Sequence, residues 1–264
     1  MRIATWNINS VRLRRDLVLR LIAEEAPDVV CLQETKVPDP QFPAEPFVEA
    51  GYGHIATAGM KGYNGVAILS RLPLQSWDVL HWCAREDCRH VIGRLPGGVE
   101  LHNLYVPAGG DVPDPDENPK FAHKLQFLDE MTAWWARERD ARTPMVLVGD
   151  LNIAPLENDV WSHRQMLDVV SHTPIEVDRL SAMQGSLGWI DAVRRFVPPE
   201  EKLFTWWSYR ARDWDASDRG RRLDHVWVTP PLADGLKGAR VIRPARGWAP
   251  KPSDHVPVIV DLDV

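Results

Sequence analysis

The chain has 264 residues, of which 44% are hydrophobic and 26% charged, and 31 basic residues against 37 acidic ones give a formal charge of −6. A chain of this length and composition can bury a large core, which excludes an intrinsically disordered protein and a small disulfide-stapled fold. No run of about 18 uncharged apolar residues occurs, so the sequence predicts no membrane-spanning helix. The acidic balance counts weakly against a polyanionic partner, because phosphate-binding proteins are usually basic.

The N-terminus and the cysteines together predict a cytoplasmic protein. The first residues reach several arginines without an apolar signal segment, so we expect no export. The three cysteines, Cys31, Cys83 and Cys88, are too few for a disulfide framework. Cys31 lies in an apolar run and is expected to be a small buried hydrophobe. A reducing compartment is the simplest setting for such a chain.

Short apolar runs alternate with amphipathic segments along the chain. The predicted strands are residues 3–6, 29–32, 65–69, 99–106, 145–148, 223–228 and 256–262. One helix is predicted over residues 12–25, where leucines recur at helical spacing. A loop rich in Pro, Gly and Asp covers residues 107–119, and a second helix follows it with Phe121, Leu125, Leu128 and Met131 on one face.

The order of these elements predicts one α/β domain over residues 1–264. Strands follow one another between Gly62 and Val106 without room for crossover helices, which favours mixed, largely antiparallel sheets covered by helices. No break in composition divides the chain. The glycine-rich motifs of P-loop and dinucleotide-binding proteins are absent, as are G-x-S-x-G and H-E-x-x-H, so those enzyme classes lack support.

Polar residues of one chemical class follow the predicted strands. They are Asn7 and Asn9, Glu34, Asp150 and Asn152, Asp224, and the pair Asp254 and His255. Carboxylates and carboxamides just beyond buried strands are placed at the mouth of a sheet, where α/β folds build their sites. The alternative is local capping and turn formation, which Asn and Asp favour. Capping explains neither Glu34 nor a histidine beside Asp254.

The same residue types suit metal-assisted hydrolysis of a phosphodiester. Carboxylate and amide oxygens are ligands for a hard cation such as Mg²⁺ or Mn²⁺. The metal would neutralise phosphate charge while a carboxylate activates water and Asn side chains donate to the phosphate oxygens. A histidine paired with a carboxylate presents a proton or a hydrogen bond in a defined orientation.

Four stretches resemble the endonuclease/exonuclease/phosphatase superfamily in order and spacing: Trp6–Asn9, Leu32–Lys36, Gly149–Asn152 and Ser253–His255. Three more resemble, more narrowly, the bacterial exonuclease III family of class II apurinic/apyrimidinic (AP) endonucleases: Gly62–Ala67, Thr205–Arg210 and Asp218–Asp224. Any one motif is a weak signal, whereas the ordered set over the whole chain is specific.

The resemblance implies a four-layer sandwich of two mixed, largely antiparallel β-sheets flanked by helices. It implies a monomeric, Mg²⁺-dependent repair nuclease, with Mn²⁺ as a substitute. The enzyme would cut double-stranded DNA 5′ to abasic sites and act on blocked 3′ ends as a phosphodiesterase, phosphatase or 3′→5′ exonuclease. The alternatives are a phosphoesterase for inositol phosphates or phospholipids, and a catalytically silent DNA-binding module. The resemblance implies no membrane partner.

The family roles map onto matching residues. The implied catalytic residues are Tyr105, Asp150, Asn152, Asp224 and His255. The implied metal-site residues are Asn7, Glu34, Asp150, Asn152, Asp254 and His255, with Glu34 as the principal ligand. The implied substrate-binding residues are Asn7, Arg89, Trp206, Arg210 and Leu223, of which Trp206 and Leu223 would line the pocket for a flipped abasic sugar.

The chain departs from the family pattern at Ala108, where many members carry Asn or Gln. The backbone N–H groups of Gly109 and Gly110 could replace the missing donor. Four acids follow in the same loop: Asp111, Asp114, Asp116 and Glu117. We expect this acidic loop to point away from DNA or to restrict which ends are processed.

Two further patterns lie outside these motifs. A four-residue hairpin loop at 84–87 would place His81, Cys83, Cys88 and His90 on one sheet face, able to bind zinc or to form a disulfide, although Arg89 between them matches a DNA contact of the family. Arginines also gather around three tryptophans at 206–222, and basic residues gather at 240–251. These clusters favour a nucleic-acid groove over a merely solvated face.

Overall fold

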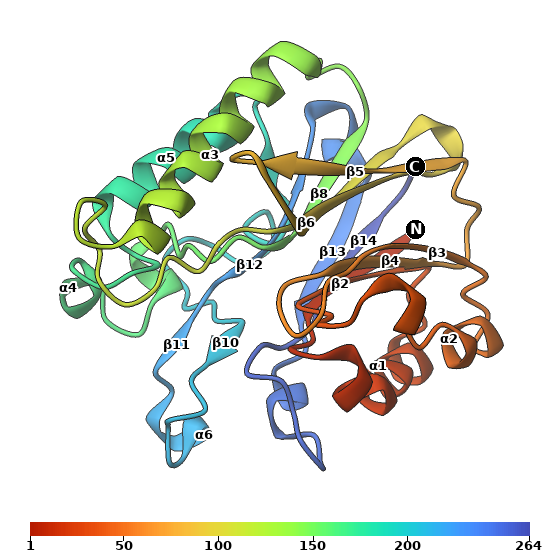
Figure 1. The fold of residues 1–264 in the computed structure, drawn as a ribbon, viewed down its shortest axis with the longest axis horizontal. Helices are drawn as coiled ribbons and strands as arrows, with labels where there is room; N and C mark the ends of the chain where they lie inside the picture. The colour runs from red at the N-terminus through yellow and green to blue at the C-terminus, as the bar shows by residue number, and fades with distance from the viewer.

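Two six-stranded sheets lie face to face in the computed structural model, which describes all residues from 1 to 264 (Figure 1). The first sheet has the order β13 (Leu236–Val241), β14 (Val258–Leu262), β1 (Arg2–Asn7), β2 (Val29–Gln33), β4 (Val66–Ser70) and β3 (His54–Ala58). The second has the order β5 (Ser76–Trp82), β6 (Arg85–Arg94), β7 (Glu100–Tyr105), β8 (Met145–Asp150), β12 (Asp224–Val228) and β9 (Ile190–Asp191).

Helices cover the outer face of each sheet. In Figure 1, α1 (Val11–Glu25) and α2 (Glu45–Glu49) lie below the first sheet, whereas α3 (Pro119–Glu138) and α5 (Pro174–Gly185) lie over the second. The remaining short elements are α4 (His163–Met166), α6 (Trp214–Ser217) and the two-stranded ribbon of β10 (Trp206–Trp207) and β11 (Gly220–Arg221). Turns of 3₁₀ helix occupy Asp39–Gln41, Pro96–Gly98, Glu157–Asp159, Pro230–Gly235 and Arg243–Gly247.

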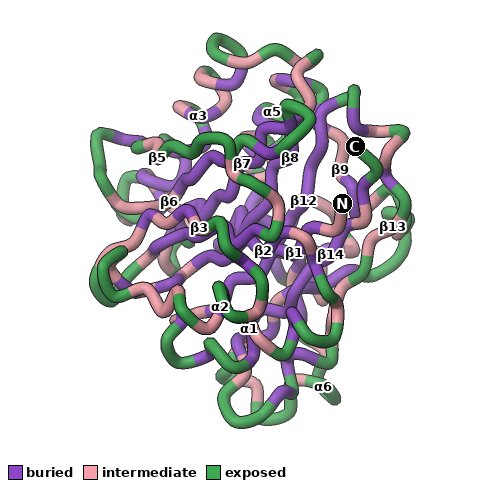
Figure 2. The backbone as a smooth tube through the Cα atoms, turned by 90° about the vertical axis from the view of Figure 1, so that its right-hand side faces the viewer, coloured by how far each residue is buried: buried purple, intermediate pink, exposed green.

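The apolar core has three layers because successive strand residues point to opposite faces. In β1, Ile3 belongs to the cluster between the sheets, while Trp6 packs on the α1 side. In β8, Val148 faces the first sheet, while Leu147 packs against the α3 side. Figure 2 shows the central strands as largely buried, whereas the edge strands β5 and β13 are mostly exposed or intermediate. This packing makes the strands a rigid platform for the residues that follow them.

The predicted fold class is confirmed. Only the pairs β1–β2 and β7–β8 are parallel, and the other strand pairs in the two large sheets are antiparallel. The predicted helix at residues 12–25 is α1, which ends where Ala26 adopts a left-handed φ of 46° just before Pro27. Strands β3 and β13 and helix α5 were not predicted. No helix is both long and apolar enough to cross a membrane.

The predicted arrangement of the 81–90 hairpin is wrong. Cys83 and Ala84 form a two-residue turn with φ of 56° and 52°, so the loop is shorter than the four residues expected. Cys83 packs on the helix side of the sheet, whereas Cys88 packs against the cluster between the sheets, and both thiols are free. His81 is exposed while His90 is buried. The four side chains therefore form neither a zinc site nor a disulfide.

Candidate active site

The ends of five central strands meet at one edge of the sandwich. β1 and β2 are parallel and end side by side, with Asn7 paired to Gln33. β7 and β8 are also parallel, with Tyr105 paired to Asp150 at their ends. The antiparallel strand β12 begins there, where Asp224 pairs with Asp150. The topology therefore gathers side chains that are distant in sequence into one cluster.

Asn7 links the two sheets through its side-chain amide. Its Nδ2 donates to Glu34 Oε1 and to Asp150 Oδ2, each at 2.8 Å. The hydroxyl of Tyr105 donates to the same Glu34 oxygen at 2.9 Å. Glu34 and Asp150 are thus held beside each other by neutral donors, which limits their mutual repulsion without removing their charge.

Glu34 and Asp254 are joined by a row of polar contacts. Lys36 Nζ lies 2.7 Å from Glu34 Oε2 and donates to Asn9 Oδ1 at 2.6 Å, while Asn9 Nδ2 donates to Asp254 Oδ1 at 3.1 Å. Burial would raise the pKa of Glu34, but Lys36 and Asn7 outweigh burial and lower it. The pKa of Asp254 is lowered as well, since His255 and hydrogen bonds offset its burial. Both carboxylates are therefore ionised at neutral pH.

His255 lies between two carboxylates. Its Nδ1 is 2.8 Å from Asp224 Oδ2, and its Nε2 is 3.6 Å from Asp150 Oδ2. Burial disfavours the charged ring, but Asp224 and Asp150 raise the pKa of His255 to about 10. Burial raises the pKa of Asp150 to about 7, although the charge of His255 opposes this shift. The Thr205 hydroxyl donates to Asp224 Oδ2 at 2.6 Å and fixes this carboxylate behind the ring.

The backbone at the site is strained. Glu34, Lys36 and Asn152 are not glycines, yet they adopt left-handed φ values of 51°, 54° and 54°. Asn152 is held there by two bonds, from its N–H to Asp150 Oδ1 at 2.9 Å and from its Nδ2 to the Val106 carbonyl at 2.9 Å. Such conformations cluster where side chains must be aimed at a ligand.

A cavity of about 240 Å³ opens on this cluster. Its polar wall comprises Glu34, Tyr105, Asn152, Asp254 and His255. The rest of its lining comprises Ala108, Gly110, Val170, Ser171, Trp206, Arg221 and Leu223. Trp206 Nε1 donates to Asp254 Oδ2 at 3.0 Å and so ties the two walls together. The structure thus brings most of the predicted residues to one cavity, with Asn7, Asp150 and Asp224 directly behind its polar wall.

Besides Asn7, two predicted substrate-binding residues, Arg89 and Arg210, lie outside this cavity. Arg89 lines a neighbouring cavity of about 480 Å³ and places its guanidinium carbon 4.9 Å from the centre of the Tyr105 ring. Arg210 lines a groove of about 620 Å³ that shares Trp206 and Arg221 with the catalytic cavity. Asp111, from the acidic loop, lines the same groove.

Three residues of the site carried no predicted role. Lys36 and Thr205 lie inside stretches that resemble the family, but nothing in their type distinguishes them from surface residues. Lys124 is completely buried in α3, where its Nζ donates to the Asn152 carbonyl at 2.8 Å and pairs with Glu176. A lysine on a helix usually faces solvent, so the sequence held no signal for this contact.

The donor set fits a divalent cation. Of the four carboxylates, those of Glu34, Asp150, Asp224 and Asp254, ion pairs form only with Lys36 and His255. Asp150, Asp224 and His255 place ligand atoms within 4.8 Å of one another, but Asp150 and Asp224 lie behind the cavity wall. The oxygens of Glu34 and Asp254, which line the cavity, are the better ligands for a hard ion.

This fold and this cluster define a phosphodiester-hydrolysing enzyme of the metal-dependent type. A model of the Endonuclease/Exonuclease/phosphatase family matches residues 4–255, so the chain belongs to that family. It is 28% identical over 276 residues to exodeoxyribonuclease III of Haemophilus influenzae, with 98% of each chain covered.

Solved structures agree with this assignment. An AP endonuclease from Archaeoglobus fulgidus matches with a TM-score of 0.92 and 32% identity over 100% of both chains. A 3′ phosphatase from Neisseria bound to a product DNA hairpin matches with a TM-score of 0.91 and 32% identity, also over 100% of both chains. The predicted family, fold and enzyme class, a nuclease of the exodeoxyribonuclease III type, are confirmed.

Proposed function

We propose that this protein is a Mg²⁺-dependent DNA repair nuclease that acts as a single domain over residues 1–264. It hydrolyses the phosphodiester 5′ to abasic sites in double-stranded DNA and removes blocking groups from 3′ ends. The observation that carries the proposal is the placement of Asp150, which Asn7 of β1 and His255, just before β14, contact from the opposite sheet. The named activities of the matched AP endonuclease and 3′ phosphatase support both parts of the proposal.

In the proposed site, Glu34 and Asp254 would hold the cation, with Asn7, Asp150, Asn152 and His255 completing its surroundings. Bound Mg²⁺ would supply positive charge to the scissile phosphate and to the departing oxygen. The carboxylates of Glu34 and Asp254 in this cavity suit Mg²⁺ and also Mn²⁺, whereas its lining offers no thiolate for a softer ion.

The chain's own residues carry the remaining chemistry. Asp150 accepts a proton from water, whose oxygen then bonds to phosphorus as the bond to the 3′ oxygen breaks, leaving a 3′-hydroxyl. Asn152, Tyr105 and the His255 ring present donors to the phosphate oxygens from one wall of the cavity. Asp224 orients His255 through the 2.8 Å contact to Nδ1, so that Nε2 faces Asp150 and the substrate side.

The groove beside the cavity supports DNA as the substrate. Arg219 lies over the Trp161 ring at 4.5 Å and Arg221 over the Trp206 ring at 5.0 Å, so flat aromatic faces alternate with cations. Such a surface binds a phosphate backbone and stacks on bases. The formal charge of −6 includes the four clustered carboxylates and therefore does not describe this face. We further propose a cytoplasmic monomer.

A substrate panel tests the proposal. Duplexes with an abasic site, with a 3′-phosphate end and without damage are compared with an inositol phosphate and a phospholipid, each with Mg²⁺ and with a chelator. We expect incision of the abasic duplex and phosphate release from the 3′ end, both lost with chelator. Hydrolysis of the inositol phosphate or the lipid alone, or DNA binding without cleavage, would overturn it.

A further inference from the structure

Arg221 reaches the wall of the catalytic cavity from the ribbon strand β11. Its Nη1 donates to the Val170 carbonyl at 3.0 Å and to Ser171 Oγ at 2.9 Å, and its guanidinium carbon lies 5.0 Å from the Trp206 ring centre. These contacts hold the guanidinium in one place. A cation fixed in this way is positioned for a ligand and not merely for solvent.

No carboxylate lies within ion-pair distance of Arg221. The next residue, Arg222, pairs instead with Asp191 and Asp159. The partners of Arg221 are all uncharged, and its buried Nε has no hydrogen-bond partner. Burial lowers the pKa of the Arg221 guanidinium. A largely buried charge without a counter-charge is costly, so an anion in the cavity would relieve that cost.

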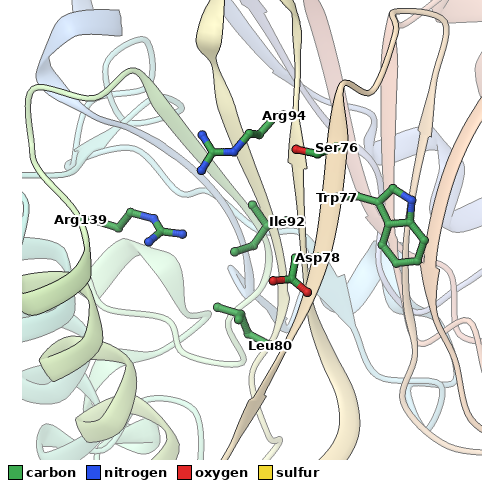
Figure 3. Close-up of a pocket in the computed structure, with 7 residues that line it drawn as sticks. All are labelled: Ser76, Trp77, Asp78, Leu80, Ile92, Arg94 and Arg139. Atoms are coloured by element: carbon green, nitrogen blue, oxygen red, sulfur yellow. The ribbon is translucent and has the colours of Figure 1, made fainter.

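A second cavity lined by arginines differs from the surroundings of Arg221. Arg94 and Arg139 approach a cavity of about 300 Å³ from different elements (Figure 3). Both are paired with Glu100, at 2.7 Å and 2.5 Å. Each of these arginines therefore has a carboxylate partner within the protein. Arg221 differs because no carboxylate pairs with it, and Glu176, the one charge that raises its pKa, is already paired with Lys124.

The position of Arg221 indicates which part of a substrate it meets. A scissile phosphate must lie against the wall formed by Glu34, Asn152 and His255. Whatever the phosphate carries beyond the scissile bond then enters the space beside Trp206, Leu223 and Arg221. An abasic sugar there is uncharged, whereas a 3′ blocking fragment that ends in a carboxylate is an anion.

We propose that Arg221 binds the anionic end of a 3′ blocking fragment, so that the enzyme prefers carboxylate-bearing 3′ ends over neutral ones of equal size. This inference rests on the proposed function. Water adds to phosphorus, the bond to the 3′ oxygen breaks, and the fragment leaves with its phosphate while Arg221 holds its carboxylate. No reactant other than water is needed.

The test compares two duplexes that differ by one charge. One ends in a 3′-phosphoglycolate and the other in a 3′-(2-hydroxyethyl) phosphate, which replaces the carboxylate by a neutral CH₂OH. We expect wild-type kcat/KM to be about 10- to 100-fold higher for the carboxylate, as for other charge-assisted hydrogen bonds. Arg221→Gln should bring the ratio to within about threefold of unity, and Arg221→Lys should keep part of the preference. The control Arg94→Gln should leave the ratio unchanged.

Because both substrates are measured on one preparation, the ratio does not depend on the folded fraction, and Arg221→Lys serves if Arg221→Gln is inactive. A wild-type ratio near unity, or an undiminished ratio in Arg221→Gln, would overturn the role of Arg221 while leaving the proposed function intact. Cleavage of neither duplex by wild type, with abasic duplex also uncut, would overturn both.

Discussion

Lys124 is buried in the second turn of α3, and its ammonium group holds together three segments around the proposed catalytic cavity. It pairs with Glu176 at the start of α5 and donates to the carbonyls of Asn152 at 2.8 Å and Ala108 at 3.3 Å. Lys124→Met keeps the length of the side chain but removes all three interactions. The expected result is a loss of stability together with looser placement of Asn152.

The size of the stability loss follows from the Glu176 charge that Lys124→Met leaves unpaired. Breaking a buried ion pair costs about 3–5 kcal/mol because one charge remains unpaired. Here Glu176 keeps the Ser171 N–H, the Thr173 N–H and the Thr173 hydroxyl as donors, so the lower end, about 3 kcal/mol, applies. An unfolding entropy of about 2.1 cal/mol/K per residue, summed over 264 residues, converts this into a Tm lower by about 5 °C.

Thermal and urea unfolding followed by circular dichroism measure the change. The double variant Lys124→Met with Glu176→Gln should be more stable than the sum of the single losses predicts, by about 1 kcal/mol or more, since both charges are then absent. Strict additivity, or a Lys124→Met variant within about 1 kcal/mol of wild type, would refute the reasoning.

Three further outcomes follow from single contacts. Gly149→Ala should abolish soluble folding, because Gly149 has φ of 142° and a Cβ there would lie 1.9 Å from a carbonyl oxygen of β7. Expression and circular dichroism measure this outcome, and a soluble, folded variant would contradict it. Thr205→Val should lower the single-turnover rate constant about 10-fold with DNA affinity retained, since Asp224 loses the donor that orients it. An unchanged rate constant would contradict this role of Thr205. Burial would raise the pKa of Glu100, but His102 and Arg139 lower it from 4.5 to about 2, so its stabilising effect is present above pH 4.5 and lost towards pH 2. Glu100→Gln should therefore be about 2 kcal/mol less stable at pH 7, and its free energy of unfolding, measured with urea, should fall less steeply than that of wild type as the pH is lowered. Parallel pH profiles of the two proteins would count against this.

The polar cluster at the cavity could be predicted because its members follow apolar strands. Asn7, Glu34 and Asp150 each come directly after a run that only a buried strand explains, and strand order then brings them together. Their residue types restrict the chemistry to hard-cation and phosphate binding. The local sequence pattern and the tertiary positions of these residues agree, so the sequence was sufficient to predict the cluster.

The remaining features depend on tertiary contacts that no local pattern encodes. The 81–90 hairpin was mispredicted because its turn uses positive φ at Cys83 and Ala84, residues that do not normally favour that conformation. Lys124 and Arg221 look like surface cations in sequence, and their roles arise from packing against other segments. Strand β13 was missed because it lies at a sheet edge and Lys237, Gly238 and Arg240 interrupt its apolar residues.

The central claim is that Asp150 performs hydrolysis in a metal-dependent DNA nuclease. The most direct measurement is single-turnover incision of an abasic duplex with Mg²⁺ by wild type, Asp150→Asn and the exposed control Asp168→Asn, with duplex affinity measured in parallel. We predict a rate at least about 1,000-fold lower for Asp150→Asn, with duplex affinity near that of wild type and an unchanged control. Incision by Asp150→Asn within about tenfold of the wild-type rate would contradict the claim.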